Sequence, residues 1–375
     1  MVKDRSSETE ACGRHVHFMR MALDLAEKGR WSAPPNPAVG AVVVAGGSIV
    51  GEGYHLRPGT PHAEVVALEE AGDLARDATI YVSLEPCDHH GRTPPCTDAI
   101  IEAGIKRVVI PCIDPSPSVS GRGLARLRAA GIEVVENVEC IAARRLNARH
   151  FKATGEGRPG VVAKIARTLD GRTALPGPAT LAVTGEQVQE YVGRRRSEVD
   201  AVMVGVGTVL ADDPLLSART GEGELLPRQP VRVVVDTRLR TPPEARMLYE
   251  PGGRILIMAG QDMADSRESE NLTRAGASIV SVPGNEAGGI DTRAMLKALA
   301  AEAVESVLVE GGGKLLHSLA EEDCIDFWQI WIAPKIIGAG RGVIFAGLEA
   351  PIRLGPLHTM AVGDDLLVSA WPESS

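Results

Sequence analysis

"HAE" at residues 62–64 and "LEPCDHHGRTPPC" at residues 84–96 are the two stretches that decide how this chain folds. They hold one histidine, one glutamate and two of the six cysteines of the chain, and each of these cysteines directly follows a proline. Histidine nitrogen and cysteine sulfur are ligands that zinc prefers in proteins. The two stretches therefore predict a zinc site.

The residues fit the signature of a zinc deaminase, H-x-E followed by P-C-x-x-C, except that eight residues separate the cysteines instead of two. We predict that His62, Cys87 and Cys96 bind one zinc ion and leave its fourth position open for a water. Zinc lowers the pKa of such a water, and the hydroxide can attack a ring carbon that bears an exocyclic amine. Glu64, which is not a ligand, would carry protons to the ring nitrogen and to the departing ammonia.

A zinc-stabilised binding module without chemistry is the main alternative. His89 or His90 would then complete the four protein ligands that structural zinc sites have. This alternative gives Glu64 no role, so we favour the enzyme. A deaminase of nucleic-acid bases is disfavoured because the formal net charge is −9 and only 3% of the residues are aromatic.

The rest of the chain indicates two α/β domains. Its 375 residues exceed the usual size of a single core, and stretches with helical and strand periodicity alternate along it. A segment rich in glycine and charge interrupts the alternation. We expect an N-terminal domain at 1–150, a linker at 151–160 and a C-terminal domain at 161–375, and we expect Thr60 to cap the helix that carries Glu64.

The sequence shows neither an apolar secretory signal nor a stretch long and apolar enough to span a membrane, which favours a cytoplasmic protein. Thiols in that compartment are reduced. Four cysteines lack neighbours that could bind a metal, and we expect them to pack as small apolar residues. They are Cys12, Cys112, Cys140 and Cys324.

Several further motifs occur in the order in which one enzyme family carries them. They include "PNPAVGAVVV", "GEGYH", "HAEV", "DPSPSVSGRG", "VGVGTVLADDPLLSAR", "VLVEGGG" and "WIAPKIIGAG". With them the chain closely resembles the bifunctional deaminase–reductases of riboflavin biosynthesis over nearly its whole length. The long insertion between the two cysteines is distinctive of this family. The resemblance implies a cytidine-deaminase-like three-layer α/β/α domain followed by a dihydrofolate-reductase-like α/β domain.

The resemblance also implies two reactions. The first is zinc-dependent deamination of 2,5-diamino-6-ribosylamino-4(3H)-pyrimidinone 5′-phosphate. The second is NADPH-dependent reduction of the ribosyl to the ribityl side chain. The resemblance further implies one Zn2+ per chain, NADPH, a phosphorylated pyrimidine as substrate and a homo-oligomer (dimer or tetramer) formed through the C-terminal domain. It implies no nucleic-acid or membrane partner.

The resemblance carries the family's site residues over by position. In the first domain the zinc and proton-transfer residues match those named above, and the substrate contacts match Asn36, His55, Arg92 and Asp114. In the second domain the substrate contacts match Lys164, Thr180, Arg196, Leu216, Arg219 and Glu310. The cofactor contacts match Ala166, Ala182, Thr208, Asp212, Thr237, Gly312, Gly313, Lys314, Leu315, Leu316, His317 and Ser318. Without the family, the glycine run that follows Glu310 would fit a tight turn as well as an anion site.

Three positions depart from the family pattern. Asp88 stands where serine is usual and adds negative charge beside a phosphate site unless Arg92 or His90 offsets it. Ser116 stands where asparagine is usual, and Ala182 stands where a tryptophan lies against the nicotinamide. The last departure motivates an alternative in which only the deaminase works and the C-terminal domain is a degenerate reductase used for assembly or substrate docking.

Overall fold

The computed structural model divides into two units, Met1–Glu156 and Gly157–Ser375, each with its own sheet and apolar cores. The structure describes residues 5–30, 32–90, 93–174, 182–286, 288–340, 342, 345, 348 and 350–373, with side chains from residue 13 onward. Two of the predicted substrate contacts, Arg92 and Thr180, lie outside the described residues.

The N-terminal unit contains, among its described residues, a five-stranded sheet with the order β2-β1-β3-β4-β5. Its strands are β1 (Gly40–Ala45), β2 (Ser48–Tyr54), β3 (Thr79–Val82), β4 (Arg107–Val109) and β5 (Glu133–Val135). Its helices are α1 (Arg5–Gly29), α2 (Ala63–Ala71), α3 (Cys96–Glu102), α4 (Arg122–Ala129), α5 (Cys140–Leu146) and α6 (Ala148–Gly155), with a 3-10 turn at Gly72–Ala75. Strand β1 runs antiparallel to both of its neighbours, whereas β3, β4 and β5 are parallel.

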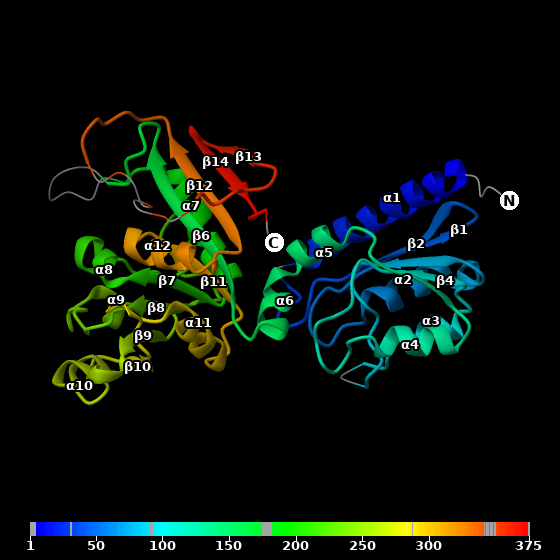
Figure 1. Ribbon diagram of the computed structural model, residues 1–375, viewed down its shortest axis with the longest axis horizontal. Coiled ribbons are helices and arrows are strands. Elements are labelled where there is room, and N and C mark those ends of the chain that lie inside the picture. Colours follow the sequence, from blue (N-terminus) through cyan, green and yellow to red (C-terminus); the bar gives the residue numbers. More distant parts are fainter. Residues whose placement is uncertain are drawn as a thin grey trace. The chain divides into compact units, whose positions relative to one another are not determined.

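Helices cover both faces of this sheet and produce three layers (Figure 1). Successive side chains of a strand point to opposite faces. In β1, Val42 and Val44 therefore pack in the core beneath α1 and α5, whereas Ala41 and Val43 pack in the core beneath α2, α3 and α4. The uninterrupted apolar character of β1 follows from this burial on both sides.

Glycines allow two helices to lie very close to the sheet. A Cβ atom at Gly40 would lie 2.1 Å from the carbonyl oxygen of Ala22 in α1, and one at Gly53 would lie 2.4 Å from that of Ala63 in α2. Such distances are far below van der Waals contact, so only glycine permits this approach. Since α2 carries Glu64, the contact at β2 also sets the position of the candidate active site.

The prediction that Thr60 caps α2 is wrong. The N-cap residue is His62, and its side chain makes no capping hydrogen bond. The Thr60 hydroxyl instead donates to the carbonyl oxygen of Arg57 at 2.8 Å, so it is already used in the turn that precedes the helix. The imidazole of His62 makes no capping bond and lies against Cys96 instead.

The segment expected to be a linker, 151–160, is largely regular structure. Helix α6 runs to Gly155, and the first strand of the next unit begins at Gly160. An ion pair between Lys152 and Glu156, with Nζ and Oε1 2.7 Å apart, joins successive turns at the end of this helix. We propose that the domain boundary lies at Glu156, where the two units divide.

The C-terminal unit contains, among its described residues, a nine-stranded sheet with the order β10-β9-β8-β7-β11-β6-β12-β14-β13. Its strands are β6 (Gly160–Thr168), β7 (Ala201–Gly205), β8 (Val231–Val235), β9 (Ile255–Gly260), β10 (Ala277–Val282), β11 (Ser306–Glu310), β12 (Phe327–Ala333), β13 (His358–Val362) and β14 (Asp365–Ala370). Its helices are α7 (Glu186–Arg195), α8 (Val206–Asp212), α9 (Arg246–Tyr249), α10 (Arg267–Arg274), α11 (Thr292–Ala301) and α12 (Gly313–Glu321), with 3-10 turns at Arg196–Glu198 and Gln261–Met263.

The strands from β10 to β12 are parallel, and helices cover both faces (Figure 1). One core lies under α11 and α12 and the other under α8 and α10, which explains the unbroken β-branched runs of these strands. The antiparallel hairpin β13–β14 at the edge was not predicted, because most of β13 is exposed and lacks an apolar run. The carboxyl ends of β6, β7, β8 and β11 share one edge, where ligands of such sheets usually bind.

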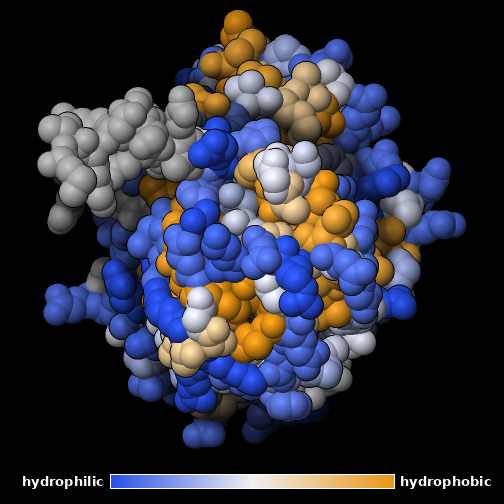
Figure 2. All heavy atoms as spheres, turned by 90° about the vertical axis from the view of Figure 1, so that its right-hand side faces the viewer, coloured by the Kyte–Doolittle hydropathy of each residue, from blue (hydrophilic) through white to orange (hydrophobic). Residues whose placement is uncertain are grey.

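The cysteines outside the zinc motif behave as predicted wherever their side chains are described. Cys112 and Cys324 are buried, Cys140 is partly buried, and none of the three forms a disulfide. Among the described residues, no helix is long and apolar enough to cross a membrane. On the face in Figure 2, hydrophilic residues predominate and apolar residues lie between them.

Candidate active sites

The structure brings His62, Cys87 and Cys96 together. Their potential ligand atoms all lie within 4.8 Å of one another. Nδ1 of His62 is 3.1 Å from Sγ of Cys96 and 3.6 Å from Sγ of Cys87. One imidazole nitrogen and two sulfurs are a donor set of catalytic zinc sites, in which a fourth position stays open. The arrangement therefore fits zinc.

The charges of the two sulfurs lead to the same conclusion. Hydrogen bonds with Cys96 and His62 lower the pKa of the Cys87 thiol to about 4, against the effect of burial. The hydrogen bond with Cys87, together with burial, raises the pKa of Cys96 far above its usual value. Without a metal, Cys87 is therefore the thiolate and Cys96 keeps its proton. A divalent metal ion would bind both sulfurs as thiolates, because its charge removes the proton from a coordinating thiol.

Two of the three residues lie at the start of a helix. His62 is the N-cap residue of α2, and Cys96 is the first residue of α3. Cys87 lies in the loop between β3 and α3. Its sulfur nevertheless accepts a hydrogen bond from the backbone N–H of Cys96 at 3.4 Å, so α3 stabilises a thiolate there through space.

Thr93 contacts the other side of the His62 imidazole, and the sequence analysis did not identify it. Its Oγ1 lies 3.3 Å from Nε2 of His62. Histidines that bind metals usually fix their second ring nitrogen in a hydrogen bond of this kind. The insertion between the cysteines thus supplies a partner for a ligand, although the spacing of the motif gives no sign of it.

Glu64 is buried next to this cluster, with 3% of its surface exposed. Burial and the negative charge on Cys87 raise the pKa of Glu64 to about 7. A carboxyl group with such a pKa can both accept and donate a proton near neutrality. Its position at the second residue of α2 places it beside the ligand His62.

Asn36 and His55 meet beside His62. The ring centroids of the two histidines are 5.2 Å apart. Nδ1 of His55 lies 3.3 Å from the carbonyl oxygen of Pro61, and its Nε2 lies 3.0 Å from Nδ2 of Asn36. The first nitrogen therefore donates, and the second accepts from the amide. Burial lowers the pKa of His55, so the ring is neutral at pH 7.

Asp114 is held by residues that the motifs did not reveal. Its Oδ1 accepts hydrogen bonds from the backbone N–H of Ser116 at 2.8 Å and from Nε2 of His150 at 2.9 Å. Its own N–H donates to Oε2 of Glu85 at 3.2 Å. His150 belongs to a segment without a recognisable motif, so only the fold indicates its proximity to Asp114.

A cluster of buried charges lies at the carboxyl edge of the second sheet. Nε and Nη2 of Arg196 lie 2.6 and 2.9 Å from the two oxygens of Glu310, and Nζ of Lys164 lies 3.8 Å from one of them. Burial alone would raise the pKa of Glu310, but Arg196 and Lys164 hold it below its usual value. Burial lowers the pKa of Lys164.

The glycine run after Glu310 forms a tight turn into α12. Gly311 and Gly312 have φ angles of 68° and 82°, which few other residues adopt. A Cβ atom at Gly312 would lie 3.4 Å from the backbone nitrogen of Gly205 and 3.6 Å from Oγ1 of Thr208, so the turn faces the start of α8. Backbone N–H groups at such a helix start suit the phosphates of a dinucleotide.

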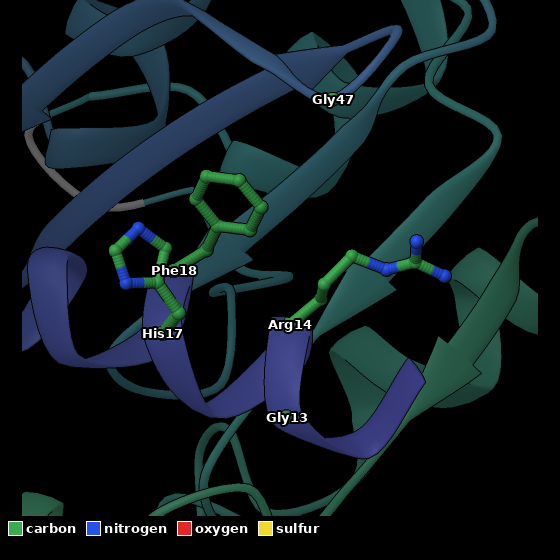
Figure 3. Close-up of a pocket in the computed structure, with 5 residues that line it drawn as sticks. All are labelled: Gly13, Arg14, His17, Phe18 and Gly47. Atoms are coloured by element: carbon green, nitrogen blue, oxygen red, sulfur yellow. The ribbon is translucent and has the colours of Figure 1, made fainter. Parts of the chain in front are cut away.

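A separate depression lies between α1 and the turn that joins β1 and β2. It is lined by Gly13, Arg14, His17, Phe18 and Gly47 (Figure 3). The side chains of His17 and Phe18 project from α1 apart from that of Arg14. None of these residues belongs to the zinc cluster or to the contacts predicted from the family.

Both units match known families. Residues 13–112 match the family model of the cytidine and deoxycytidylate deaminase zinc-binding region, and residues 159–368 match that of the RibD C-terminal domain. The chain is 39% identical to the riboflavin biosynthesis protein RibD of Aquifex aeolicus (strain VF5) over 94% of this chain and 97% of that protein. It is 40% identical to the RibD of Escherichia coli (strain K12) over 89% and 92%. This chain belongs to the RibD family.

Solved structures of RibD proteins agree with this membership. RibD of Acinetobacter baumannii, form 1, has a TM-score of 0.79 and 34% identity over 96% of this chain and 99% of that one. The diaminohydroxyphosphoribosylaminopyrimidine deaminase/5-amino-6-(5-phosphoribosylamino)uracil reductase of Thermotoga maritima has a TM-score of 0.76 and 35% identity, with the same coverage. The predicted resemblance and fold are thus confirmed.

The departure from the RibD pattern at Asp88 is compensated by a residue that the sequence did not indicate. Nη1 of Arg126 in α4 lies 2.7 Å from Oδ1 of Asp88, and the hydroxyl of Thr97 donates to the same oxygen at 2.7 Å. Burial would raise the pKa of Asp88, but these hydrogen bonds hold it below its usual range. Among the described residues, Arg126 therefore offsets the charge, and the predicted contribution of Arg92 lies outside them.

The departure at Ala182 lies on an exposed residue. Nζ of Lys335 donates to the carbonyl oxygens of Val183 at 2.7 Å and of Ala182 at 3.3 Å. This contact fixes the backbone at the position where the RibD pattern has tryptophan, although the aromatic surface is missing. The cofactor role of Ala182 stays a prediction.

Three of the RibD-derived residues have side chains that are buried in the core or already hydrogen-bonded within the protein. Leu315 and Leu316 are 8% and 0% exposed and pack in the core, so only their backbone atoms are available to a cofactor. Arg219 donates to Oγ of Ser217 at 2.8 Å and to the carbonyl oxygen of Gly223 at 2.9 Å, so its guanidinium is already engaged.

Several other RibD-derived positions lie on elements that border the carboxyl edge, and their roles stay predictions. Ala166 lies on β6, Asp212 ends α8 and Thr237 follows β8. Leu216 is buried with a φ angle of 56°, a strained conformation for this residue. Nε2 of His317 is 3.0 Å from Oε1 of Glu321, one turn further along α12.

Proposed function

We propose that the chain catalyses two successive reactions of riboflavin biosynthesis. The first is the zinc-dependent deamination of 2,5-diamino-6-ribosylamino-4(3H)-pyrimidinone 5′-phosphate, and the second is the NADPH-dependent reduction of the ribosyl side chain of the product. Membership of the RibD family supports the deaminase–reductase class. The observation that carries the proposal is the cluster of one imidazole and two sulfurs with Glu64 buried beside it.

In the deaminase half, His62, Cys87 and Cys96 would hold zinc, which supplies an activated water when bound. Glu64 would take a proton from the nucleophile and pass it to the substrate, a role for which a pKa of about 7 is well suited. Asn36 and the neutral His55 would orient the pyrimidine through hydrogen bonds. These side chains lie on different elements, which the sheet and α2 hold in place.

In the reductase half, backbone N–H groups of the glycine turn before α12 would hold the phosphates of the cofactor, which supplies a hydride when bound. Lys164, Arg196 and Glu310 would hold the sugar through its hydroxyl groups. Because burial lowers the pKa of Lys164, its ammonium can release a proton more readily than an exposed lysine. We propose NADPH as the nicotinamide cofactor from the RibD resemblance.

A deaminase with an inactive second domain is the alternative that the exposed Ala182 favours. The two proposals differ in one measurement. With the deaminated substrate supplied directly, the bifunctional enzyme oxidises NADPH, whereas the deaminase-only protein does not at any protein concentration. Absorbance of the reduced cofactor follows this reaction.

Glu64→Gln tests the deaminase half. The variant should keep its zinc, since Glu64 is not a ligand, and should lose about 10²–10⁴-fold of its ammonia release, the usual contribution of a general acid–base group. It should still oxidise NADPH with the deaminated substrate.

The control is Glu69→Gln, an exposed position on the same helix, which should leave both reactions unchanged. If Glu64→Gln instead released ammonia at the full rate, Glu64 would have no role in the reaction, and the zinc-stabilised binding module would be favoured. The measured ammonia would then come from a contaminating enzyme.

We also propose a cytoplasmic homo-oligomer formed through the C-terminal unit. Leu357, Met360 and Leu366 expose apolar side chains at and beside the edge hairpin β13–β14, with 62%, 41% and 39% of their surfaces accessible. An edge strand with apolar side chains tends to pair or become covered. Light scattering of the purified protein would give the mass, and a monomer would contradict the proposal.

A further inference from the structure

Glu85 is a buried carboxylate to which the proposed reaction assigns no role. It is 4% exposed and follows β3, two residues before Cys87. Its Oε2 accepts hydrogen bonds from the backbone N–H groups of Asp114 at 3.2 Å and of Gly121 at 2.9 Å. Its Oε1 is buried and has no hydrogen-bond partner among the described residues. A buried carboxylate is costly, so its retention calls for an explanation.

The two N–H groups are the two ends of one loop, residues 114–121. Asp114 begins this loop, and Gly121 is the N-cap residue of α4, with a φ angle of 79°. Inside the loop, the N–H groups of Val119 and Ser120 both donate to the carbonyl oxygen of Ser116 at 2.9 Å. One carboxylate oxygen therefore closes a compact loop at both of its ends.

The backbone beside Glu85 packs against the start of α4. A Cβ atom at Gly123 would lie 2.1 Å from the carbonyl oxygen of Pro86 and 3.5 Å from Oε1 of Glu85. The positive end of the helix dipole favours a negative charge at this place. The stretch that leads into Cys87 and the loop that carries Asp114 are thus joined through the Glu85 side chain and through this close contact.

We propose that Glu85 is a positioning residue for the deamination, which holds Asp114 at the correct distance from the metal ligands. The proposal rests on the proposed deaminase function, in which Asp114 contacts the substrate. Glu85 itself touches neither the substrate nor the metal, and it acts through the backbone of residues 114–121. A displaced contact weakens binding of the substrate more than the chemical step, so the effect belongs in KM.

Two conservative variants of Glu85 distinguish the effect of its side-chain length from the effect of its charge. Glu85→Gln keeps a carbonyl oxygen at the same distance and can accept both N–H groups, but it loses the charge. Glu85→Asp keeps the charge, but its oxygens retract by one methylene and no longer reach both N–H groups. A positioning role predicts that the glutamine variant is the better enzyme, whereas an acid–base or electrostatic role predicts the opposite order.

The experiment measures KM and kcat for ammonia release, zinc per chain, and hydrogen exchange of the segment 113–122. We expect Glu85→Asp to raise KM about tenfold with kcat nearly unchanged, since small misplacements of binding groups have large effects. Exchange at the amides of Asp114 and Gly121 should accelerate in this variant, because both lose their acceptor. Glu85→Gln should stay within about threefold of the parent in KM.

Three results would overturn the inference: the reverse order of the two variants, unchanged exchange in Glu85→Asp, or loss of zinc from Glu85→Asp as the cause of its defect. Failure of the proposed function gives a different result. In that case the parent protein itself releases no ammonia, while the exchange measurement still reports whether Glu85 holds the loop.

Discussion

At the scale of single residues, Asp88 and Arg126 show how an added negative charge is neutralised by a neighbouring side chain. Asp88 lies four residues before the predicted substrate contact Arg92 in the sequence, and its partner Arg126 comes from α4. The Asp88 side chain is 20% exposed and that of Arg126 is 42% exposed, so solvent screens much of their attraction. The pair thus serves mainly to neutralise the charge that Asp88 adds next to the zinc ligand Cys87, near the proposed site of the phosphorylated substrate.

Replacing Arg126 by alanine should raise KM for the phosphorylated substrate about threefold, an effect of the size that exposed charge pairs produce. The reason is that Asp88 then repels the phosphate without compensation. Adding Asp88→Ser should restore KM, because serine removes the repelling charge. The measurement is a double-mutant cycle on KM for ammonia release.

Arg128→Ala provides the matched control. It lies on the same helix, but its guanidinium pairs with Glu136. KM should not change in this variant. If the effects of Arg126→Ala and Asp88→Ser simply add, the two side chains are not coupled and the explanation is wrong.

At the scale of elements, the distance between α2 and β2 controls the zinc cluster. Gly51 and Gly53 of β2 face this helix, and a Cβ atom at Gly51 would lie 2.1 Å from the carbonyl oxygen of Ala67. The helix can therefore not keep its place if either glycine gains a side chain. Because His62 and Glu64 lie at its start, packing of the helix and geometry of the site are linked.

Gly53→Ala should push α2 away from the sheet and destabilise the N-terminal unit by about 1–3 kcal/mol, the usual cost of overpacking. We also expect less than one zinc per chain after purification. Urea unfolding and metal analysis measure these two effects.

Gly13→Ala is the control, since nothing lies within 4 Å of its Cβ position in α1. This exposed helical site should keep its stability or gain up to about 1 kcal/mol from the higher helix propensity of alanine. Full zinc content and an unchanged unfolding midpoint in Gly53→Ala would show that the close approach is not needed.

At the scale of the whole molecule, the two units have separate sheets and separate apolar cores. The zinc cluster belongs to the first unit and the buried charge cluster to the second. Each of the two candidate sites is therefore supported by the sheet and the core of its own unit. The two activities should respond independently to loss of the metal.

Removal of zinc with a chelator should abolish ammonia release and leave NADPH oxidation with the deaminated substrate unchanged. The N-terminal unit should also unfold at a lower temperature, since a ligand that binds only the folded state stabilises it. Calorimetry and the two assays measure this, and chelator saturated with zinc beforehand is the control. Equal loss of both activities would contradict independent sites.

The sequence by itself determined whatever is encoded within a few neighbouring residues. The motif with His62 and Glu64 and the two Pro-Cys pairs indicated the metal cluster, and the apolar runs indicated the strands, because burial on both faces requires them. The turn at Gly46-Gly47 is also a local feature, because both residues adopt positive φ angles that glycine tolerates. The hairpin β13–β14 escaped prediction because its exposed strand needs no apolar pattern.

Only the tertiary structure decided which distant side chains meet. Arg126 and Asp88, His150 and Asp114, and Glu85 and Gly121 are each separated by 36 or more residues. A charged residue on a helix has the same local pattern whether it faces solvent or a partner, because hydrogen bonds and ion pairs depend on distance in space. Local periodicity is set by the backbone of each element, whereas these contacts are set by how the elements pack.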